Sequence, residues 1–323
     1  MSSMLAGVAS ADGLRMAQVP IPSPAADQVL VRVRAAGLNR ADLLAATGAY
    51  AGPNAGAGAP IGMEWAGEIV EAGSDVRGFK AGDRVACSGM GGYAQYALAD
   101  PGRCIPLSGG DFTHAAILPM VLMTAHDAVV TQGRLSPGEA VLVQGASSAV
   151  GLAAMQIARL LGAGVVIGTS TNRARREQLA RFGADLAVDP GVEGWAERVR
   201  AETGGKGVDL TIDMVSGAGL GQVMAASAVL GRIVNVGRLG GGKVEFDLNE
   251  HALKRLTYIG VTFRTRSPAE VREIVERMRA DVWDQALAGA ISLPVQTFPL
   301  SDAIAAQDCM KANRHFGKLA LIP

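Results

Sequence analysis

The middle of the chain alternates short apolar runs with longer amphipathic stretches. Residues 141–162 predict a buried strand, a tight turn of small residues from Gly145 to Gly151, and a helix that begins near Val150. The next helix is expected to be capped by Asn172 and stopped by Gly183. Further strands are predicted at 165–168, 186–189, 208–213 and 232–236, and further helices at 172–182, 194–203 and 217–230. Strands that alternate with helices predict a doubly wound parallel sheet.

The flanking regions have a different pattern. In residues 29–34 the valines at every second position face one way and Arg32 and Arg34 face the other, which is typical of a half-buried strand. Glycine-rich breaks at 73–74, 78 and 82–83 separate further short segments, so this region is predicted to be β-rich. The tail from about residue 293, with a helix at 301–311 and a strand at 318–322, is expected to return to the same β-rich body.

The turn after residue 144 has the features of a phosphate-binding loop. Small side chains let the backbone approach a pyrophosphate, and the helix that follows directs its unpaired N–H groups at the anion. The residues expected to take part are Gly145, Ser147, Ser148, Ala149 and Val150. The alternative is an ordinary strand-to-helix turn, because Ala146, Ser148 and Ala149 stand where glycines are commonest.

The tip of the second strand indicates which dinucleotide would bind. Enzymes that use NAD usually place an Asp or Glu there, whereas residues 168–176 contain hydroxyls, an amide and three arginines but no carboxylate. Guanidinium groups favour a 2′-phosphate, so NADP(H) is the expected cofactor, held by Thr169, Ser170, Asn172 and Arg175. The alternative is that the three arginines form a solvated helix face.

Composition narrows the class of protein. The chain has 323 residues, 30 basic and 30 acidic side chains, and 49% hydrophobic residues, which suits a two-domain globular protein and gives no reason to expect a nucleic-acid partner. No apolar run is long enough for a membrane span and no secretory signal is visible, so a cytoplasmic location is expected. The three cysteines are too few and scattered for a disulfide framework and are expected to be small buried residues.

Several separate motifs occur in an order that resembles the medium-chain dehydrogenase/reductase superfamily. They are residues 31–42 (VRVRAAGLNRAD), 62–67 (GMEWAG), 78–85 (GFKAGDRV), 92–96 (GYAQY) and the turn described above. Within the superfamily the chain is similar to the zinc-independent quinone oxidoreductases, the branch of zeta-crystallin and the stress-inducible quinone reductases. The resemblance implies an α/β protein, with a β-rich GroES-like catalytic domain at 1–117 completed by 287–323 and a Rossmann NADP(H)-binding domain at 118–286.

The residues at the zinc positions of this superfamily indicate the chemistry. Zinc-dependent members have a Cys after the first strand and a His in a Gly-His-Glu segment, and this chain has Asn39 and Met63 there, beside Glu64. An amide and a thioether do not replace a thiolate and an imidazole for Zn²⁺, so no metal is expected. Without a Lewis acid the substrate must itself be electrophilic, which predicts transfer of a hydride from NADPH to a quinone. The alternatives are an enone, a 2-alkenal or an enoyl-thioester as acceptor, and, in a different class, a non-catalytic NADPH-binding structural or RNA-binding protein.

The resemblance also implies roles for individual residues. Tyr50 and Asn39 are expected to be catalytic, Asn39 near the nicotinamide ribose and Tyr50 as a group that orients a carbonyl or donates a proton. The alternatives are a packed loop tyrosine and an amide that caps a turn. Other expected cofactor contacts are Thr124, Gly237, Phe263 and Asn313, and the expected substrate pocket contains Met63, Trp65 and Met90, although Trp65 could equally be a core residue.

Two further points follow from the resemblance. Family members commonly carry a Tyr beside the 2′-phosphate after the third strand, and this chain has Pro190 there, which weakens the preference for NADPH over NADH. Residues 256–263 correspond to the last strand of the dinucleotide domain, which this family commonly pairs across a two-fold axis. A homodimer is therefore expected, because an unpaired apolar edge strand promotes association.

Overall fold

The computed structural model describes residues 2–48 and 56–323, and the chain divides into two compact units. The first unit contains Met1–Val121, Arg264–Leu287 and Pro294–Pro323, and the second contains Leu122–Phe263 and Ala288–Leu293. These ranges differ from the expected domains mainly in Arg264–Leu287, which packs in the first unit. The Arg272 Nε atom donates to Asp100 Oδ2 at 2.8 Å in that unit. Among the described residues, no helix has the length and apolar character needed to cross a membrane.

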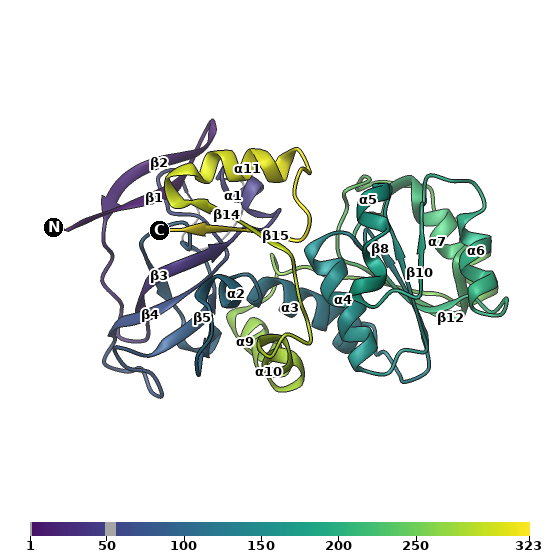
Figure 1. The fold of residues 1–323 in the computed structure, drawn as a ribbon, viewed down its shortest axis with the longest axis horizontal. Coiled ribbons are helices and arrows are strands. Elements are labelled where there is room, and N and C mark those ends of the chain that lie inside the picture. Colours follow the sequence, from purple (N-terminus) through teal and green to yellow (C-terminus); the bar gives the residue numbers. More distant parts are fainter. Residues whose placement is uncertain (1, 49–55) are drawn as a thin grey trace. The chain divides into compact units, whose positions relative to one another are not determined.

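The second unit is built on a six-stranded sheet in the order β10-β9-β8-β11-β12-β13, with every neighbouring pair parallel (Figure 1). Its strands are β8 (Ala140–Gln144), β9 (Val165–Thr169), β10 (Leu186–Val188), β11 (Val208–Asp213), β12 (Ser227–Asn235) and β13 (Thr257–Gly260). The strand order runs outward in both directions from the central pair β8 and β11, so the predicted doubly wound sheet is confirmed.

Helices connect these strands, and two of them differ from the sequence prediction. The helices of the second unit are α4 (Ala149–Leu160), α5 (Arg173–Arg176), α6 (Trp195–Glu202), α7 (Leu220–Ala226) and α8 (Leu248–Lys254), while α3 (Pro119–His126) crosses the boundary between the units. The single helix predicted at 172–182 is wrong, because a 3₁₀ turn at Leu179–Phe182 follows α5. Both end residues of that turn are buried, and a spacing of three residues places them on one face of a 3₁₀ turn.

The helix predicted at 217–230 is also too long. It ends at Ala226, and Ser227–Asn235 continues as strand β12. Ser227 lies opposite Val208 in the parallel pairing of β12 with β11, so tertiary pairing decides the conformation of residues that are locally ambiguous. The Ser227 hydroxyl donates to the Val223 carbonyl at 2.8 Å and so closes the preceding helix.

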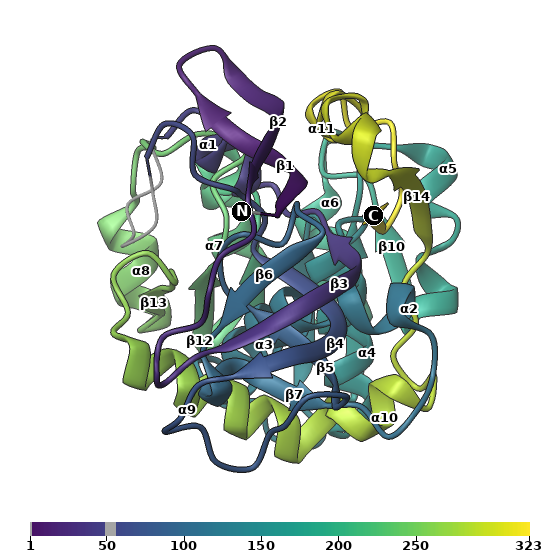
Figure 2. The same ribbon diagram turned by 90° about the vertical axis from the view of Figure 1, so that its left-hand side faces the viewer.

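The first unit holds a seven-stranded sheet and a separate hairpin, seen from the strand face in Figure 2. The sheet order is β14-β15-β3-β4-β5-β7, with β6 also pairing with β3. The strands are β1 (Ser3–Ser10) and β2 (Gly13–Pro20) in the hairpin, then β3 (Val29–Gly37), β4 (Glu64–Ala72), β5 (Arg84–Ser88), β6 (Tyr96–Ala99), β7 (Cys104–Pro106), β14 (Val295–Pro299) and β15 (Lys318–Ile322). The tail therefore returns to the β-rich body as predicted, with β15 antiparallel to β3.

Five helices belong to the described part of the first unit, and β3 contributes buried valines to its core. The helices are α1 (Asp42–Ala45), α2 (Phe112–Ala116), α9 (Pro268–Met278), α10 (Asp284–Leu287) and α11 (Ala303–Lys311). Val31 and Val33 are buried in the core, whereas Arg32 and Arg34 are exposed, which confirms the predicted alternation. Asn39 lies two residues after the end of β3, and Lys318 is the first residue of β15.

Candidate functional site

The turn between β8 and α4 in the second unit has the backbone geometry of a phosphate-binding loop. Gly145 has a φ of 72°, a conformation that glycine adopts without strain. A Cβ atom on Gly151 would lie 2.6 Å from the Ala146 Cα atom, so only glycine lets α4 approach the turn this closely. The Ser148 hydroxyl accepts a hydrogen bond from the Gly151 N–H at 3.1 Å and caps α4. The 12-residue helix thus begins at Ala149 with its N-terminus directed at the turn, as an anion site requires.

Hydrogen bonds join the end of β9 to this turn. The Thr169 hydroxyl donates to Gln144 Oε1 at 2.5 Å and accepts from the Gly145 N–H at 3.1 Å. The Ser170 hydroxyl donates to the Ser147 hydroxyl at 3.0 Å. The fold therefore brings together the predicted residues of the first turn and of the second strand tip, which are some 25 positions apart.

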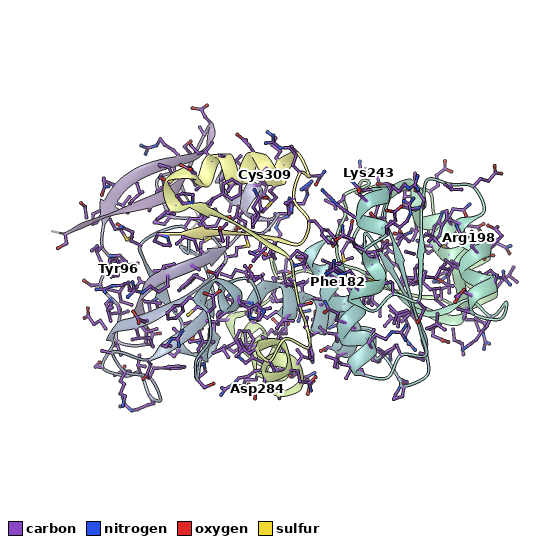
Figure 3. The ribbon with its side chains drawn as sticks, in the orientation of Figure 1. Tyr96, Phe182, Arg198, Lys243, Asp284 and Cys309 are labelled. Carbon is purple, nitrogen blue, oxygen red and sulfur yellow. The ribbon has the colours of Figure 1, made fainter. Side chains whose placement is uncertain are left out.

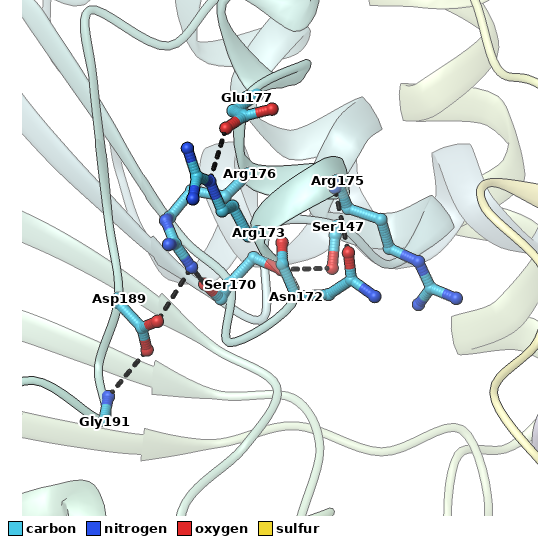
Figure 4. A network of polar contacts seen from close by, with 9 residues as sticks. All are labelled: Ser147, Ser170, Asn172, Arg173, Arg175, Arg176, Glu177, Asp189 and Gly191. Carbon is cyan, nitrogen blue, oxygen red and sulfur yellow. Dashed lines mark hydrogen bonds and ion pairs between the residues drawn. The ribbon is translucent and has the colours of Figure 1, made fainter.

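The three arginines at the second strand tip have different surroundings (Figure 4). Arg176 is held within the fold, because its Nη1 atom donates to the Ser170 carbonyl at 2.6 Å and to Asp189 Oδ2 at 2.9 Å. Arg173 is exposed and pairs with Glu177 at 2.8 Å. Arg175 directs its guanidinium group away from Asp189, and its backbone N–H donates to the capping Asn172 side chain at 3.0 Å. A phosphate contact of Arg175 stays a prediction.

Asp189 brings a carboxylate to this tip, although residues 168–176 contain none. It follows β10, accepts from the Gly191 N–H at 3.0 Å and pairs with Arg176, so its charge is compensated. A ribose-binding carboxylate of the NAD type would need an oxygen available to the sugar hydroxyls. The paired Asp189 does not replace it, and the donor-rich tip fits the 2′-phosphate of NADP(H).

The end of β12 forms a second polar cluster in the same unit. The Gly237 carbonyl accepts from the Ser216 hydroxyl at 2.9 Å and from Asn235 Nδ2 at 3.2 Å. Ser216 has a φ of 56° and a ψ of −148°, which is strained for any residue other than glycine. Asp213 accepts from the Ser216 N–H at 2.9 Å, and burial raises the pKa of its carboxyl. Strain held by such a network is typical of functional sites.

Three further residues were predicted to contact the cofactor. Thr124 lies on α3 and is half-buried. Phe263 is also half-buried and is the last residue of the range Leu122–Phe263 of the second unit. Asn313 belongs to the first unit and is exposed, with a φ of 52° just after α11, where an asparagine commonly ends a helix. For these three residues a cofactor contact stays a prediction.

In the first unit, Asn39 lies in a buried polar network at the end of β3. Its Nδ2 atom donates to Glu64 Oε1 at 2.9 Å, and its Oδ1 atom accepts from Lys318 Nζ at 3.0 Å. Lys318 also pairs with Glu64 and donates to the Leu38 carbonyl at 2.7 Å. The Glu64 and Lys318 side chains are 0% and 3% exposed, so this is an ion pair inside the protein.

Asp42 lies beside this network. Its Oδ2 atom accepts from the Asn39 N–H at 2.7 Å and from the Tyr93 hydroxyl at 2.8 Å. Burial raises the pKa of the Asp42 carboxyl to about 7, an effect that the two hydrogen bonds and Lys318 oppose. Burial, with the nearby Asp42 carboxyl, also raises the pKa of Tyr93 well above its usual value. Asp42 thus holds a proton at a pH where an exposed aspartate has lost it.

The predicted substrate-pocket residues are placed mostly in the core. Trp65 and Met63 are buried in the hydrophobic core of the first unit, and Met90 packs against the same cluster while partly buried. A Cβ atom on Gly89 would lie 2.7 Å from the Trp65 ring, so the ring is closely packed. A pocket role for these residues stays a prediction. Tyr50 lies outside the described residues.

The residues around Glu64 do not fit a zinc ion. The two positions expected to carry ligands hold Asn39 and Met63, and the Lys318 ammonium group already occupies the oxygen ligands that Glu64 and Asn39 would offer. A second cation beside that ammonium would be repelled, and the donor set lacks thiolate and imidazole. Across residues 2–48 and 56–323, no three His, Cys, Asp or Glu side chains are grouped as metal ligands would be.

Sequence reasoning missed Lys318, Asp42 and Tyr93 as members of this network. The available signal for Lys318 was a single charged residue at the start of the otherwise apolar segment 318–322. A lysine that is fully buried needs a partner, so its placement in a predicted buried strand already implied an acidic neighbour. Which acidic residue that is depends on the pairing of β15 with β3.

Comparison with known families agrees with this geometry. Residues 25–109 match the family described as "Alcohol dehydrogenase GroES-like domain", and residues 149–280 match "Zinc-binding dehydrogenase". The first match lies in the first unit, which contains Asn39 and Glu64. The second match begins at Ala149, the first residue of α4.

Individual relatives fall into two groups. The chain is 30% identical to the quinone oxidoreductase of Rattus norvegicus over 311 residues, which is 94% of this chain and 92% of that protein. It is 33% identical over 316 residues to a phenolphthiocerol/phthiocerol polyketide synthase of Mycobacterium tuberculosis. That match covers 96% of this chain but 14% of the synthase, so the chain spans about a seventh of that relative's length.

Solved structures with the same fold include a mycobacterial protein complexed with NADPH, with a TM-score of 0.85, 26% identity and 100% of both chains covered. Another is the CurK enoyl reductase, with a TM-score of 0.84 and 26% identity, covering 99% of this chain and 98% of that one. Full-length similarity to a quinone oxidoreductase and both family matches lead to one assignment. The chain belongs to the quinone oxidoreductase branch of the medium-chain dehydrogenase/reductase superfamily.

Proposed function

We propose that this protein transfers a hydride from NADPH to a quinone without the help of a metal ion. The observation that carries the proposal is the buried group around Glu64, in which the Lys318 ammonium binds the Glu64 and Asn39 oxygens that a metal ion would need. With no Lewis acid to polarise an ordinary carbonyl, the acceptor has to be electrophilic by itself, as a quinone is. The name of the rat relative supports this substrate class.

NADP(H) is the cofactor, and this chain offers a set of donors that fits it. The pyrophosphate would be held by Gly145, Ser147, Ser148, Ala149 and Val150, at the N-terminus of α4. The adenosine 2′-phosphate would be held at the second strand tip by Thr169, Ser170, Asn172 and Arg175. When bound, NADPH supplies the hydride and its two electrons. The mycobacterial protein complexed with NADPH supports this choice of cofactor.

On the substrate side we assign Asn39 and Tyr50 as catalytic residues. Asn39 contributes a fixed amide, and a Tyr50 hydroxyl would orient or protonate the acceptor oxygen. Met63, Trp65 and Met90 would limit the size of the substrate. Thr124, Gly237 and Phe263 would contact the nicotinamide part of the cofactor, and Asn313 would reach the cofactor from the returning tail. Orientation of two bound reactants can by itself lower a barrier by roughly 7 kcal/mol or more.

A second candidate substrate is an enoyl-thioester. Two relatives favour it by their names, because one is a polyketide synthase subunit and the other, CurK, is an enoyl reductase. An alkene conjugated to a thioester carbonyl accepts hydride at its β-carbon, so it also needs no metal. The same cofactor site would serve either acceptor.

The experiment that tests the function is stopped-flow oxidation of NADPH with a panel of acceptors. The panel contains a benzoquinone, an ortho-quinone, an enone, a 2-alkenal and an enoyl-thioester, each repeated with NADH and with a chelator. We expect rapid turnover with NADPH and a quinone that the chelator leaves unchanged. Turnover with the thioester alone would replace the quinone by the second candidate. Tight NADPH binding without turnover on any acceptor would favour a binding protein.

The proposal also includes a homodimer in the cytoplasm with a small-molecule substrate and neither a nucleic-acid nor a membrane partner. Support for the dimer comes from β13, which is the edge strand of its sheet and carries a partly exposed Tyr258. Exposed Leu248 and Leu253 on the neighbouring α8 add apolar surface. Light scattering tests it, and a monomeric mass at micromolar concentration would contradict it.

A further inference from the structure

The side-chain amide of Asn39 is held in one orientation by two charged neighbours. Its Nδ2 atom donates to Glu64 Oε1 at 2.9 Å, and its Oδ1 atom accepts from Lys318 Nζ at 3.0 Å. An ammonium group can only donate and an ionised carboxylate can only accept. If the amide were rotated by half a turn, its oxygen would face the Glu64 carboxylate and its NH2 group would face the Lys318 ammonium. The two charges therefore determine which amide atom is oxygen and which is nitrogen.

The two neighbours are themselves fully engaged. The three N–H groups of Lys318 have three acceptors, which are Glu64, Asn39 and the Leu38 carbonyl at 2.7 Å. The other Glu64 oxygen accepts from the Met120 N–H at 2.8 Å. Because both charges are buried, neither can reorient without leaving the other as an uncompensated charge inside the protein.

We propose that Asn39 acts only as a hydrogen-bond donor, and that the buried Lys318–Glu64 pair is the device that makes it one. The second N–H of its amide then binds an acceptor oxygen, either a ribose hydroxyl of the cofactor or a carbonyl of the substrate. Lys318 and Glu64 are positioning residues, and the ammonium on Oδ1 also polarises the amide and strengthens the N–H as a donor. This inference rests on the proposed role of Asn39 in cofactor or substrate binding.

The test compares variants that alter the donor with variants that alter its support. Asn39→Asp replaces the N–H donor by an acceptor of nearly the same shape, and Asn39→Ala removes the amide. Lys318→Met alone leaves Glu64 buried and unpaired, so the informative variant is Lys318→Met/Glu64→Gln, which removes both charges and keeps the volume. Lys311→Met, on an exposed lysine at the end of α11, is the matched control.

The readouts are the equilibrium dissociation constant for NADPH, kcat and the KM for a benzoquinone, with thermal unfolding to show that each variant is folded. We expect Asn39→Asp and Asn39→Ala to weaken the binding of one ligand by about tenfold or more, because each variant loses a hydrogen bond. A larger NADPH dissociation constant identifies the ribose as the partner. A changed kcat or quinone KM with normal NADPH binding identifies the substrate.

The double variant should show the same selective loss as the Asn39 variants, while Lys311→Met behaves as wild type. A folded double variant with wild-type constants, beside damaged Asn39 variants, would overturn the positioning role. If Asn39→Ala also has wild-type constants, the assigned role of Asn39 is wrong. If the wild-type protein neither binds nor oxidises NADPH, the proposed function itself is wrong.

A different observation concerns two thiols in the first unit. Cys87 on β5 and Cys104 on β7 are directly opposite in an antiparallel pair, and their Sγ atoms are 3.5 Å apart. The Leu107 N–H donates to the Arg84 carbonyl at 2.9 Å, which makes positions 84 and 107 a hydrogen-bonded pair. Such pairs alternate along the ladder, so positions 87 and 104 form a non-hydrogen-bonded pair, whose Cα atoms approach to about 4.5 Å. Disulfides accept that separation.

We infer that Cys87 and Cys104 are a modification site that forms a disulfide with a peroxide as oxidant. One thiol attacks the peroxide, breaks its O–O bond and becomes a sulfenic acid with release of water. The second thiol attacks that sulfur, forms the S–S bond and releases a second water, so two thiols and one hydrogen peroxide give one disulfide and two waters. Both thiols are free and buried in this structure, so the reaction should be slow.

Mass spectrometry after incubation with hydrogen peroxide tests the site, with Cys309 on α11 as an internal comparison (Figure 3). We expect a loss of two hydrogen atoms, a peptide linking positions 87 and 104, and reversal by a thiol reductant. Cys87→Ser and Cys104→Ser should each abolish the linked peptide, and Cys309→Ser should leave it unchanged. Three free thiols in the denatured protein after prolonged oxidation, or a linkage through Cys309, would overturn the assignment.

Discussion

The buried carboxyl of Asp42 should make the stability of this protein depend on pH in a way that one substitution removes. Asp42 is 0% exposed, and its Oδ1 atom meets no hydrogen-bond donor among the described residues. Its pKa is about 7 in the fold, against an ordinary value of 3.8. Asn imitates the protonated acid and can still accept from the Asn39 N–H and the Tyr93 hydroxyl.

The sign follows from where the proton is held. Between about pH 4 and pH 7 the folded protein keeps a proton on Asp42 that the unfolded chain releases, so the free energy of unfolding falls as pH rises through this window. Each pKa unit corresponds to about 1.36 kcal/mol, and a difference of about three units gives a loss of the order of 4 kcal/mol. The stabilising contribution is complete below about pH 4 and is lost as pH passes the folded pKa.

Urea unfolding of the wild type and Asp42→Asn at several pH values between about 4 and 8 measures this effect. The stability of the variant relative to the wild type should rise by a few kcal/mol across the window, and Asp308→Asn, at an exposed position on α11, is the matched control. Parallel curves for the wild type and Asp42→Asn would refute the reasoning, because they would mean that Asp42 binds its proton equally in the folded and unfolded states.

Four other predictions concern the cofactor, the substrate and the assembly. Arg175→Ala should raise the KM for NADPH much more than that for NADH, while Arg173→Ala should change neither, and equal effects of Arg175→Ala on both cofactors would contradict the phosphate role. Tyr50→Phe should lower kcat with unchanged NADPH binding, and an unchanged kcat would make it a packing residue. Ser148→Ala should cost about 1 kcal/mol in urea unfolding through loss of the α4 cap and should weaken NADPH binding in titration, and wild-type values would argue against the cap. Tyr258→Lys should give a monomer in light scattering if β13 pairs across a dimer interface, and a persisting dimer would place the interface elsewhere.

Local sequence predicted most of the second unit because its strands and helices follow strong patterns. The expected strand at 208–213 coincides with β11, and both the Asn172 cap and the left-handed Gly183 are present. The errors lie where local preference is weak. Residues 227–230 suit a helix or a strand equally, and the strand there begins at Ser227, which pairs with Val208 of β11.

The candidate site was likewise predictable only in part from neighbouring residues. The turn around Gly145 and the donor-rich second strand tip were each predicted from residues that are close together in the sequence. The pairing of Arg176 with Asp189 was not readable, because it depends on how β10 lies beside β9. The pairing holds Arg176 within the fold, whereas the phosphate contact was predicted for Arg175.

Local periodicity and neighbouring residues were enough to predict the order of strands and helices, the phosphate-binding turn and the preference for NADP(H). The chemistry around Asn39, in contrast, depends on contacts between distant parts of the chain. Lys318 lies 279 positions from Asn39 and 254 from Glu64, and the three meet because β15 returns to pair with β3. Burial then gives these polar groups their properties, because an unpaired charge inside the protein is costly and each group must take the partner that the fold places beside it.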